Sequence, residues 1–418
     1  MEEEVVLKNN EEGRKALIST FENYSKKFYE FEKSYRIEEL KEKARRIREK
    51  NIKNVFELLK RAKENFEKNK INFYFAKNGE EANRIILGLI GEEKEVIKSK
   101  SNVANEIFLK ENLRKNGKQV LETDCGDFLV ELCEEEASHP VLPAISIPLS
   151  RMKEKIKEKF GKELNTPEEI AHFVRDYLKE KSKKAKVGIT GANFFTAEGS
   201  IVIVENEGNV SLSSMLEKHI VITSMDKICE NLEEAIFLAK LQSLFATGSI
   251  ASRITIISSP SNTGDIEEKK VYGMHASKEI HFVVIDNKRS ELLKNGFEEA
   301  LYCINCGRCL YYCPLFREIL KDYGFGSFFG GIGIIKAIFI EGKEEIFEKS
   351  FLCSTCKHCE EVCPVKINIP GMLRKIRAFA VERGKGTKTN EEMVERIRKY
   401  GNPFGEVGEK IPEKLFCC

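Results

Sequence analysis

Two cysteine runs of identical spacing constrain this chain more than any other feature. Both follow C-x2-C-x2-C-x3-C-P, the bacterial ferredoxin pattern, in which the fourth cysteine of each run ligates the cluster of the other run. The runs are Cys303, Cys306, Cys309 and Cys313, then Cys353, Cys356, Cys359 and Cys363. The pattern predicts one [4Fe-4S] cluster on Cys303, Cys306, Cys309 and Cys363, and a second on Cys353, Cys356, Cys359 and Cys313.

Zinc is the main alternative, because C-x2-C pairs also form structural zinc sites. Such sites usually separate two pairs by a longer loop, whereas three cysteines spaced three apart wrap one corner of a cluster. We therefore favour two clusters, and with them electron transfer. His358 lies inside the second run, but four thiolates are already available there, so we expect a surface residue or a neighbour of the cluster.

The segment between the runs indicates a helical ferredoxin module rather than a compact small ferredoxin. Residues 323–333 are rich in glycine and phenylalanine, and residues 334–348 are expected to be helical, with Gly342 as a weak point. The apolar segment suits either peripheral membrane association or packing around the clusters, and we favour packing.

The rest of the chain predicts helices followed by an α/β domain. Residues 10–65 show amphipathic helical spacing, and from residue 70 short strands alternate with helices, which favours a mostly parallel sheet. The expected helices include 80–90, 105–116 and one capped by Asn231. The expected strands are 71–76, 95–98, 119–122, 141–143, 187–190, 200–205, 219–223, 254–258 and 280–286.

No G-x-G-x-x-G or Walker A sequence occurs, so no conventional nicotinamide, flavin or ATP site is expected. Polar, glycine-containing turns at 188–193, 198–200 and 206–209 suit either an anion site or hairpin turns. We favour a hairpin between strands 201–205 and 210–212. Weak catalytic candidates in these turns are Asn193, Glu198 and Glu207.

Charge and hydropathy exclude several classes of protein. Lys plus Arg total 69 against 67 Asp plus Glu, a formal charge of +2, which argues against a nucleic-acid-binding protein. The first residues lack the apolar stretch of a signal peptide, and no run is apolar enough to cross a membrane. A cytoplasmic protein without a transmembrane segment is expected.

From about residue 35 to 375 the chain resembles the iron-sulfur lactate-utilisation protein B family, whose N-terminal part is a LUD domain. The two cysteine runs follow the other matching stretches in the family's order. These stretches are 81–83, 96–101, 122–124, 188–193, 206–209, 246–248, 286–287 and 289–290.

The resemblance implies an α/β fold similar to glucosamine-phosphate isomerases and CoA-transferases, carrying a helical two-cluster ferredoxin module. It also implies a complex with a CCG-domain iron-sulfur subunit and a second LUD subunit that oxidises L-lactate to pyruvate. In that complex the chain relays electrons through its eight cysteines.

Some segments depart from the family. Residues 197–200 (Ala-Glu-Gly-Ser) are one residue shorter than the usual motif, and His275 precedes alanine where glycine is common. The stretch 401–406 resembles the linker before CCG domains in heterodisulfide-reductase-like subunits. We expect Cys417 and Cys418 to end a mobile tail, and Cys125, Cys133 and Cys229 to act as small buried hydrophobes.

Three functions remain open from the sequence. The first is the electron-transfer subunit of the lactate-oxidising complex. The second is a relay between a flavin-dependent 2-hydroxyacid dehydrogenase and a heterodisulfide-reductase-like partner. The third is a CoA-transferase-like domain with Glu198 as nucleophile and structural or sensing clusters.

The expected division of the chain has four parts. They are N-terminal helices (1–65), the LUD domain (66–295), the ferredoxin module (296–375) and a tail or partner-docking segment (376–418).

Overall fold

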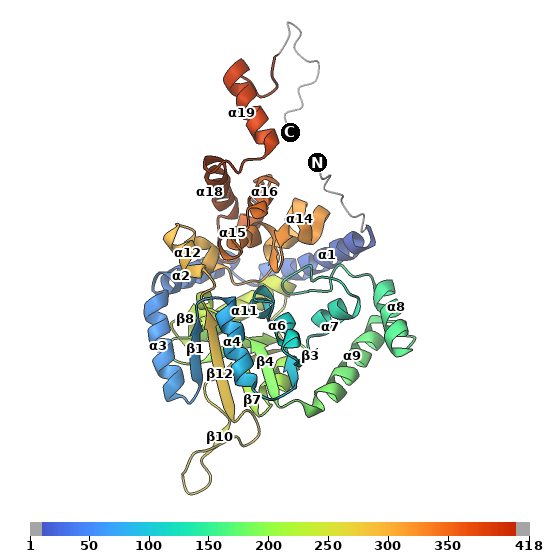
Figure 1. Cartoon of the computed structure of the whole chain (residues 1–418), viewed down its shortest axis with the longest axis vertical. Coiled ribbons are helices and arrows are strands. Elements are labelled where there is room, and N and C mark those ends of the chain that lie inside the picture. The colour runs from blue at the N-terminus through green and yellow to red at the C-terminus, as the bar shows by residue number, and fades with distance from the viewer. Residues whose placement is uncertain (1–10, 407–418) are drawn as a thin grey trace.

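The computed structural model describes residues 11–406 and centres on a six-stranded sheet (Figure 1). The strand order is β1-β12-β7-β4-β2-β3, and every neighbouring pair is parallel. The strands are β1 (Asn72–Ala76), β2 (Glu95–Lys98), β3 (Gln119–Glu122), β4 (Val187–Gly191), β7 (Lys218–Ser224) and β12 (Glu279–Ile285). The expected α/β fold with a mostly parallel sheet is confirmed.

The strand order reverses direction between β2 and β4. The chain leaves β2 for the outer strand β3, whereas it leaves β4 for β7 on the other side. In open parallel sheets, ligands bind in the crevice at the carboxyl ends of the strands where the order reverses. This edge carries the turns after Lys98 and Gly191.

Helices pack around the parallel sheet (Figure 1). The helices of the α/β domain are α4 (Gly79–Ile90), α5 (Asn102–Glu106), α6 (Leu109–Lys115), α7 (Cys125–Leu132), α8 (Leu149–Phe160), α9 (Pro167–Lys181), α10 (Asn209–Ser214), α11 (Leu232–Thr247) and α12 (Arg289–Lys294). Helix α11 begins where expected, because Asn231 Oδ1 accepts a hydrogen bond from the Glu234 N–H at 2.9 Å.

A second, four-stranded sheet has the order β8-β5-β6-β9. Its strands are β5 (Phe194–Thr196), β6 (Ile201–Glu205), β8 (Ile228–Cys229) and β9 (Arg253–Ile257). Strand β6 is antiparallel to both β5 and β9. Two short hairpins, β10 (Asn262–Thr263) with β11 (Val271–Tyr272) and β13 (Gly324–Phe325) with β14 (Phe328–Phe329), complete the strands.

Three local predictions were wrong. Residues 141–143 form no strand, because the Val141 and Leu142 N–H groups donate to Nδ1 of His139 instead of to a neighbouring strand. Residues 210–212 lie in α10, where Ser211 donates from both N–H and Oγ to the Glu205 carboxylate. The helix expected over 105–116 is broken at Phe108, which has φ +52°.

The N-terminal helices join the α/β domain to the C-terminal module. They are α1 (Glu11–Ser34), α2 (Ile37–Lys53) and α3 (Val55–Lys68). Leu17, Phe21 and Phe28 of α1 belong to one buried cluster that also contains residues of α11 and of the C-terminal module. In Figure 1, α1 lies along the base of that module.

The C-terminal module is helical, as expected. Its helices are α13 (Arg308–Tyr311), α14 (Pro314–Ile319), α15 (Gly330–Ile340), α16 (Glu345–Phe351), α17 (His358–Glu361) and α18 (Ile369–Glu382), and α19 (Lys388–Tyr400) follows. The helix expected over 334–348 is interrupted at Gly342, which has φ +68°.

Helix α19 projects away from the module (Figure 1). Cys417 and Cys418 lie outside the described residues. Within residues 11–406, no helix is long and apolar enough to cross a membrane.

Candidate functional site

The two cysteine loops share one backbone conformation. Asn305 and Thr355, the second residue after the first cysteine of each run, both have φ +57°. The residue after the second cysteine is also left-handed in each loop, with φ +73° at Gly307 and +69° at Lys357. The Asn305 N–H points to Cys303 Sγ at 3.4 Å. In the other loop, the Thr355 N–H points to Cys353 Sγ at 3.3 Å.

The first loop and a distant cysteine surround one cavity of about 90 Å³. Four cysteines line it: Cys303, Cys306, Cys309 and Cys363. The structure therefore brings together the four side chains that the ferredoxin pattern assigns to one cluster, although Cys363 belongs to the second run.

A second cavity, of about 30 Å³, is lined by the complementary set: Cys313, Cys353, Cys356 and Cys359. Cys309, Leu310 and Ile369 line both cavities, so a single layer of side chains separates them. His358 is exposed beside this second loop.

The electrostatics of these thiols suit ligation to iron. Burial raises the pKa of Cys359 and Cys363 to about 12, and it raises the pKa of Cys306 as well. Buried thiols of this kind ionise when a metal cation compensates the thiolate charge. Backbone N–H groups aimed at Sγ, such as Phe316 N–H to Cys313 at 3.4 Å, add the hydrogen bonds that cluster sulfurs accept. The donor set fits two [4Fe-4S] clusters.

Within the described part of the chain, no three His, Cys, Asp or Glu side chains converge on a point that would hold a single metal ion.

The glycine- and phenylalanine-rich segment packs around these cavities. Phe328, Phe329 and Ile332 are buried and line the first cavity. Gly333 is required there, because a Cβ at this position would lie 2.5 Å from the Phe328 carbonyl carbon. The segment therefore packs against the first cavity, in agreement with the packing interpretation.

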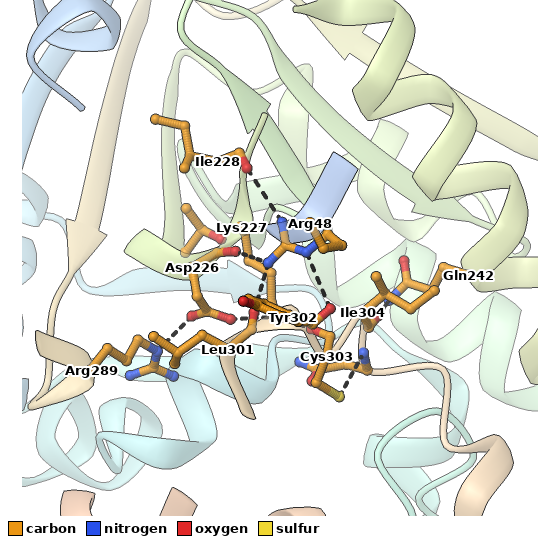
Figure 2. A network of polar contacts seen from close by, with 12 residues as sticks. Arg48, Asp226, Lys227, Ile228, Gln242, Arg289, Leu301, Tyr302, Cys303 and Ile304 are labelled. Carbon is orange, nitrogen blue, oxygen red and sulfur yellow. Dashed lines mark hydrogen bonds and ion pairs between the residues drawn. The ribbon is translucent and has the colours of Figure 1, made fainter. Parts of the chain in front are cut away.

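Arg48 of α2 holds the chain that leads into the first loop. Its guanidinium is fully buried and donates to the carbonyl oxygens of Tyr302 at 3.1 Å and Leu301 at 2.7 Å (Figure 2). It also donates to the carbonyl oxygens of Asp226 and Ile228. One side chain thus fixes α2, the turn after β7 and the approach to Cys303.

A row of buried charges connects the α/β domain to the first cysteine. Glu106 forms a two-pronged ion pair with Arg289, with both N···O distances 2.8 Å. Arg289 Nε donates to Asp226 at 2.6 Å, and Lys227 Nζ contacts Asp226 at 2.8 Å. Lys227 also donates to the Cys303 carbonyl oxygen at 2.7 Å. Figure 2 shows Lys227 between Asp226 and the loop.

The charges in this row are strongly perturbed. Burial alone would raise the pKa of Asp226, but Lys227 and Arg289 outweigh it and hold that pKa well below its ordinary value. Burial lowers the pKa of Lys227 to about 8, against the opposing effect of Asp226. Removal of any one member would leave at least one buried charge with one partner fewer.

Asn193, one of the predicted site residues, joins the α/β domain to the cluster loop. Its amide nitrogen donates to Gln242 Oε1 at 2.8 Å, and its amide oxygen accepts from the Val204 N–H at 2.8 Å. Gln242 in turn donates to the Ile304 carbonyl oxygen at 2.6 Å. Asn193 therefore acts as a positioning residue.

The sequence analysis did not predict a role for His139, although this residue packs against the first cysteine loop. It is buried and stacks on Tyr311 with ring centroids 5.1 Å apart. It also lies so close to Gly307 that a Cβ there would be 2.6 Å from the His139 ring. Burial lowers the pKa of His139 to about 3, so the ring is neutral. No motif marks this residue in the sequence.

A larger cavity, of about 260 Å³, opens at the carboxyl edge of the parallel sheet. Ser101, after β2, and Gly191, at the end of β4, both line it. Asn305 and Lys227 line this cavity and the first cysteine cavity alike. The α/β domain therefore has a polar pocket directly beside the first cysteine site.

The structure separates the two predicted carboxylates. Glu207 lines the larger cavity, and its Oε2 accepts from the Cys125 N–H at 2.9 Å. Glu198 is exposed, is absent from the cavity walls and accepts from the Leu232 N–H at 3.0 Å. The predicted hairpin at 206–209 is wrong, because this turn leads into α10 and contributes Asn206, Glu207 and Asn209 to the cavity.

Comparisons with known proteins agree with this two-part architecture. Residues 59–285 match the LUD domain model, and residues 299–367 match the 4Fe-4S dicluster domain model. The uncharacterized electron transport protein YkgF of Escherichia coli K12 is 32% identical over 372 residues, which cover 87% of this chain and 76% of that protein. Lactate utilization protein B of Bacillus thuringiensis is 33% identical over 371 residues, with the same shares.

A DUF162 family protein from Deinococcus radiodurans, solved by crystallography, aligns with a TM-score of 0.31 and 13% identity, covering 55% of this chain and 98% of that one.

Proposed function

Because the chain belongs to the lactate utilization protein B family, we propose that it is the electron-transfer subunit of a multi-subunit complex that oxidises L-lactate to pyruvate. The family resemblance drawn from the sequence motifs is confirmed. An iron-sulfur electron-transfer role agrees with the dicluster match and with a relative described as an electron transport protein. The observation that carries the proposal is the pair of adjacent cavities, which the eight cysteines of the two runs line between them.

In this proposal Cys303, Cys306, Cys309 and Cys363 hold one cluster, and Cys353, Cys356, Cys359 and Cys313 hold the other. When bound, such clusters each accept and release one electron. The chain's own residues set the conditions for this transfer. Arg48, Lys227 and Gln242 fix the first loop, and Ile332 of α15 adds an apolar side chain to the cavity wall.

In this proposal each of the four parts of the chain has its own role. The helices of 1–65 clamp the LUD domain (66–295) against the ferredoxin module (296–375). The segment 376–418 docks a partner. This last role is supported by α19, on which Met393, Ile397 and Tyr400 are exposed at helical spacing.

The ligand assignment is tested by comparing cysteine variants of the full chain, purified without oxygen and examined by EPR. Crossed ligation predicts that Cys363→Ser has the spectrum of Cys306→Ser, and that Cys313→Ser has the spectrum of Cys356→Ser. If Cys363→Ser instead matches Cys356→Ser, each run binds its own cluster and the assignment fails. Cys125→Ser, outside both cavities, is the control.

The partners are tested by isolating the tagged chain from its native cells under anaerobic conditions. We expect a CCG-domain subunit and a second LUD subunit in stoichiometric amounts. Recovery of a flavin-dependent dehydrogenase or of heterodisulfide-reductase-like subunits would replace the lactate complex with the second relay described above.

A further inference from the structure

The larger cavity lies where a parallel sheet usually binds its ligand. It is formed at the carboxyl ends of β2 and β4, where the strand order reverses direction. Its floor depends on Gly191, because a Cβ there would approach Ser101 to 3.0 Å. The close approach of the turns after β2 and β4 therefore favours glycine at this position.

The size and lining of the cavity restrict the class of ligand. A volume of about 260 Å³ is below the range of drug-sized pockets. Among the described residues no aromatic side chain lines it, so the stacking surface that a nucleotide base or a flavin ring uses is missing. Amides dominate the polar lining: Asn102, Asn193, Asn206, Asn209, Asn305 and Gln242. This lining suits a small, oxygen-rich molecule.

One cation in the wall, Lys100, forms no direct ion pair among residues 11–406, although its charge acts to lower the pKa of Glu207 and of Asp127. Lys100 follows β2 and donates to the Val141 carbonyl oxygen at 2.5 Å, its single hydrogen bond among residues 11–406. The other lysine of the wall, Lys227, is already paired with Asp226. Of the two lysines in the wall, Lys100 is therefore the one whose ammonium is not already in a direct ion pair and can contact an anion.

Three carboxyl groups line the same cavity: Asp124, Glu205 and Glu207. Glu205 is already held by Ser211 and Thr255. Glu207 is held by the Cys125 N–H, and Asp124 caps the same helix by accepting from the Asp127 N–H at 3.0 Å. Desolvation, and then the charge of Asp124, raise the pKa of Glu207. With its pKa raised to about 7, the Glu207 carboxyl is able to donate a hydrogen bond near neutral pH.

We propose that this cavity binds a small carboxylate that carries a hydroxyl or keto oxygen on the adjacent carbon. The carboxylate lies at Lys100, and the second oxygen faces the Glu207 and Asp124 pair. This assignment deepens the proposed function, on which it rests, by naming a ligand site in the LUD domain.

The site communicates with the first cluster site through Asn305. This residue lines both cavities, its N–H contacts Cys303 Sγ, and the Cys303 thiol lies 3.4 Å from its amide oxygen. A ligand that contacts Asn305 changes the hydrogen bonds around a cluster sulfur. Because such bonds tune cluster potentials, binding has a spectroscopic signature that needs no turnover.

The test titrates L-lactate and pyruvate separately into the cluster-loaded full chain, by calorimetry and by EPR of the reduced protein, with acetate as the probe that lacks the second oxygen. We expect saturable binding of L-lactate or pyruvate, with acetate about tenfold weaker, and a shift in one cluster signal. Lys100→Met should weaken binding about tenfold or more, whereas Lys60→Met, an exposed lysine on α3, should leave it unchanged.

A second variant, Glu207→Gln, keeps the proposal testable if Lys100→Met fails to fold. Glu207→Gln, at the exposed mouth of the cavity, should keep both clusters and flatten the dependence of binding on pH. Cluster content is measured before each titration, so the two proposals fail separately. Cluster-loaded protein that binds neither L-lactate nor pyruvate overturns the ligand site. Binding that is as tight, and depends on pH in the same way, in both variants as in wild type also overturns it. Protein that binds a probe but assembles no clusters overturns the relay and keeps the site.

Discussion

Lys227 donates from Nζ to the carbonyl oxygen of Cys303 across 2.7 Å, and this bond ties a buried charge of the LUD domain to the first cysteine loop. The same ammonium contacts Asp226 at 2.8 Å. The position of the first loop therefore depends on an ion pair in the other domain.

Lys227→Met should destabilise the loaded protein by about 3 kcal/mol, because Asp226 keeps Arg289 but loses one of its two buried cationic partners. The shift in urea midpoint of the anaerobic protein measures the effect. As a control, Lys321→Met removes a partly exposed pair with Glu136 and should cost about 1 kcal/mol or less. Equal shifts for the two variants would contradict a structural role for Lys227.

Gly307→Ala should prevent assembly of the first cluster while the second remains. Its Cβ would lie 2.6 Å from the His139 ring at a φ of +73°. Lys357 occupies the equivalent position of the other loop, so Lys357→Gly is the matched control and should leave both clusters intact. Iron content and EPR distinguish the two variants, and full loading of Gly307→Ala would refute the predicted contact.

Gln242→Leu should cost about 1–3 kcal/mol and alter the EPR signal of the first cluster. The substitution leaves the Asn193 amide and the Ile304 carbonyl without their partner. Gln119→Leu changes an exposed glutamine and should have neither effect. An unchanged spectrum in Gln242→Leu would show that this bond does not position the loop.

Because His219 is buried, the free energy of unfolding of the protein should decrease as the pH is lowered. Burial lowers its pKa to about 3, and its Nε2 lies 2.8 Å from Thr190 Oγ1. Below about pH 6.5 the unfolded state binds a proton that the folded state excludes, so stability drops by about 1.4 kcal/mol per pH unit until the folded pKa is reached.

The measurement compares unfolding free energies at about pH 7.5 and pH 5.5 for wild type, His219→Gln and His172→Gln. His219→Gln should lose about 1.4 kcal/mol less on acidification than wild type, and His172→Gln, a substitution at an exposed position, is the control. The same acid sensitivity in all three proteins would contradict a neutral, buried His219.

Several elements with strong local sequence signals were predicted correctly. Strands β2 and β3 have the expected bounds, and the Asn231 cap starts α11, because alternation, apolar runs and caps are properties of a few neighbouring residues. The cysteine spacing led to the two sets that now line separate cavities, and their assignment as ligands stays a prediction.

The contacts between distant segments were not predictable from the sequence. Arg48, Asp226, Arg289 and Cys303 come from four separate parts of the chain and meet only through the fold. The strand expected at 141–143 failed for a local reason, since the nearby His139 ring takes the N–H groups that a sheet would use, and no motif marks that contact. Glu198 and Glu207 are similar in local sequence context, and the fold alone decides that Glu207 enters the cavity.

The central claim, electron relay through two adjacent clusters, is tested most directly by EPR of the fully reduced, full-length protein with its iron and sulfide content measured. The account predicts about eight iron and eight sulfide per chain, and signals from two [4Fe-4S]⁺ centres broadened by their mutual magnetic interaction. Zinc in place of iron, or a single unbroadened cluster signal from fully loaded protein, would contradict it.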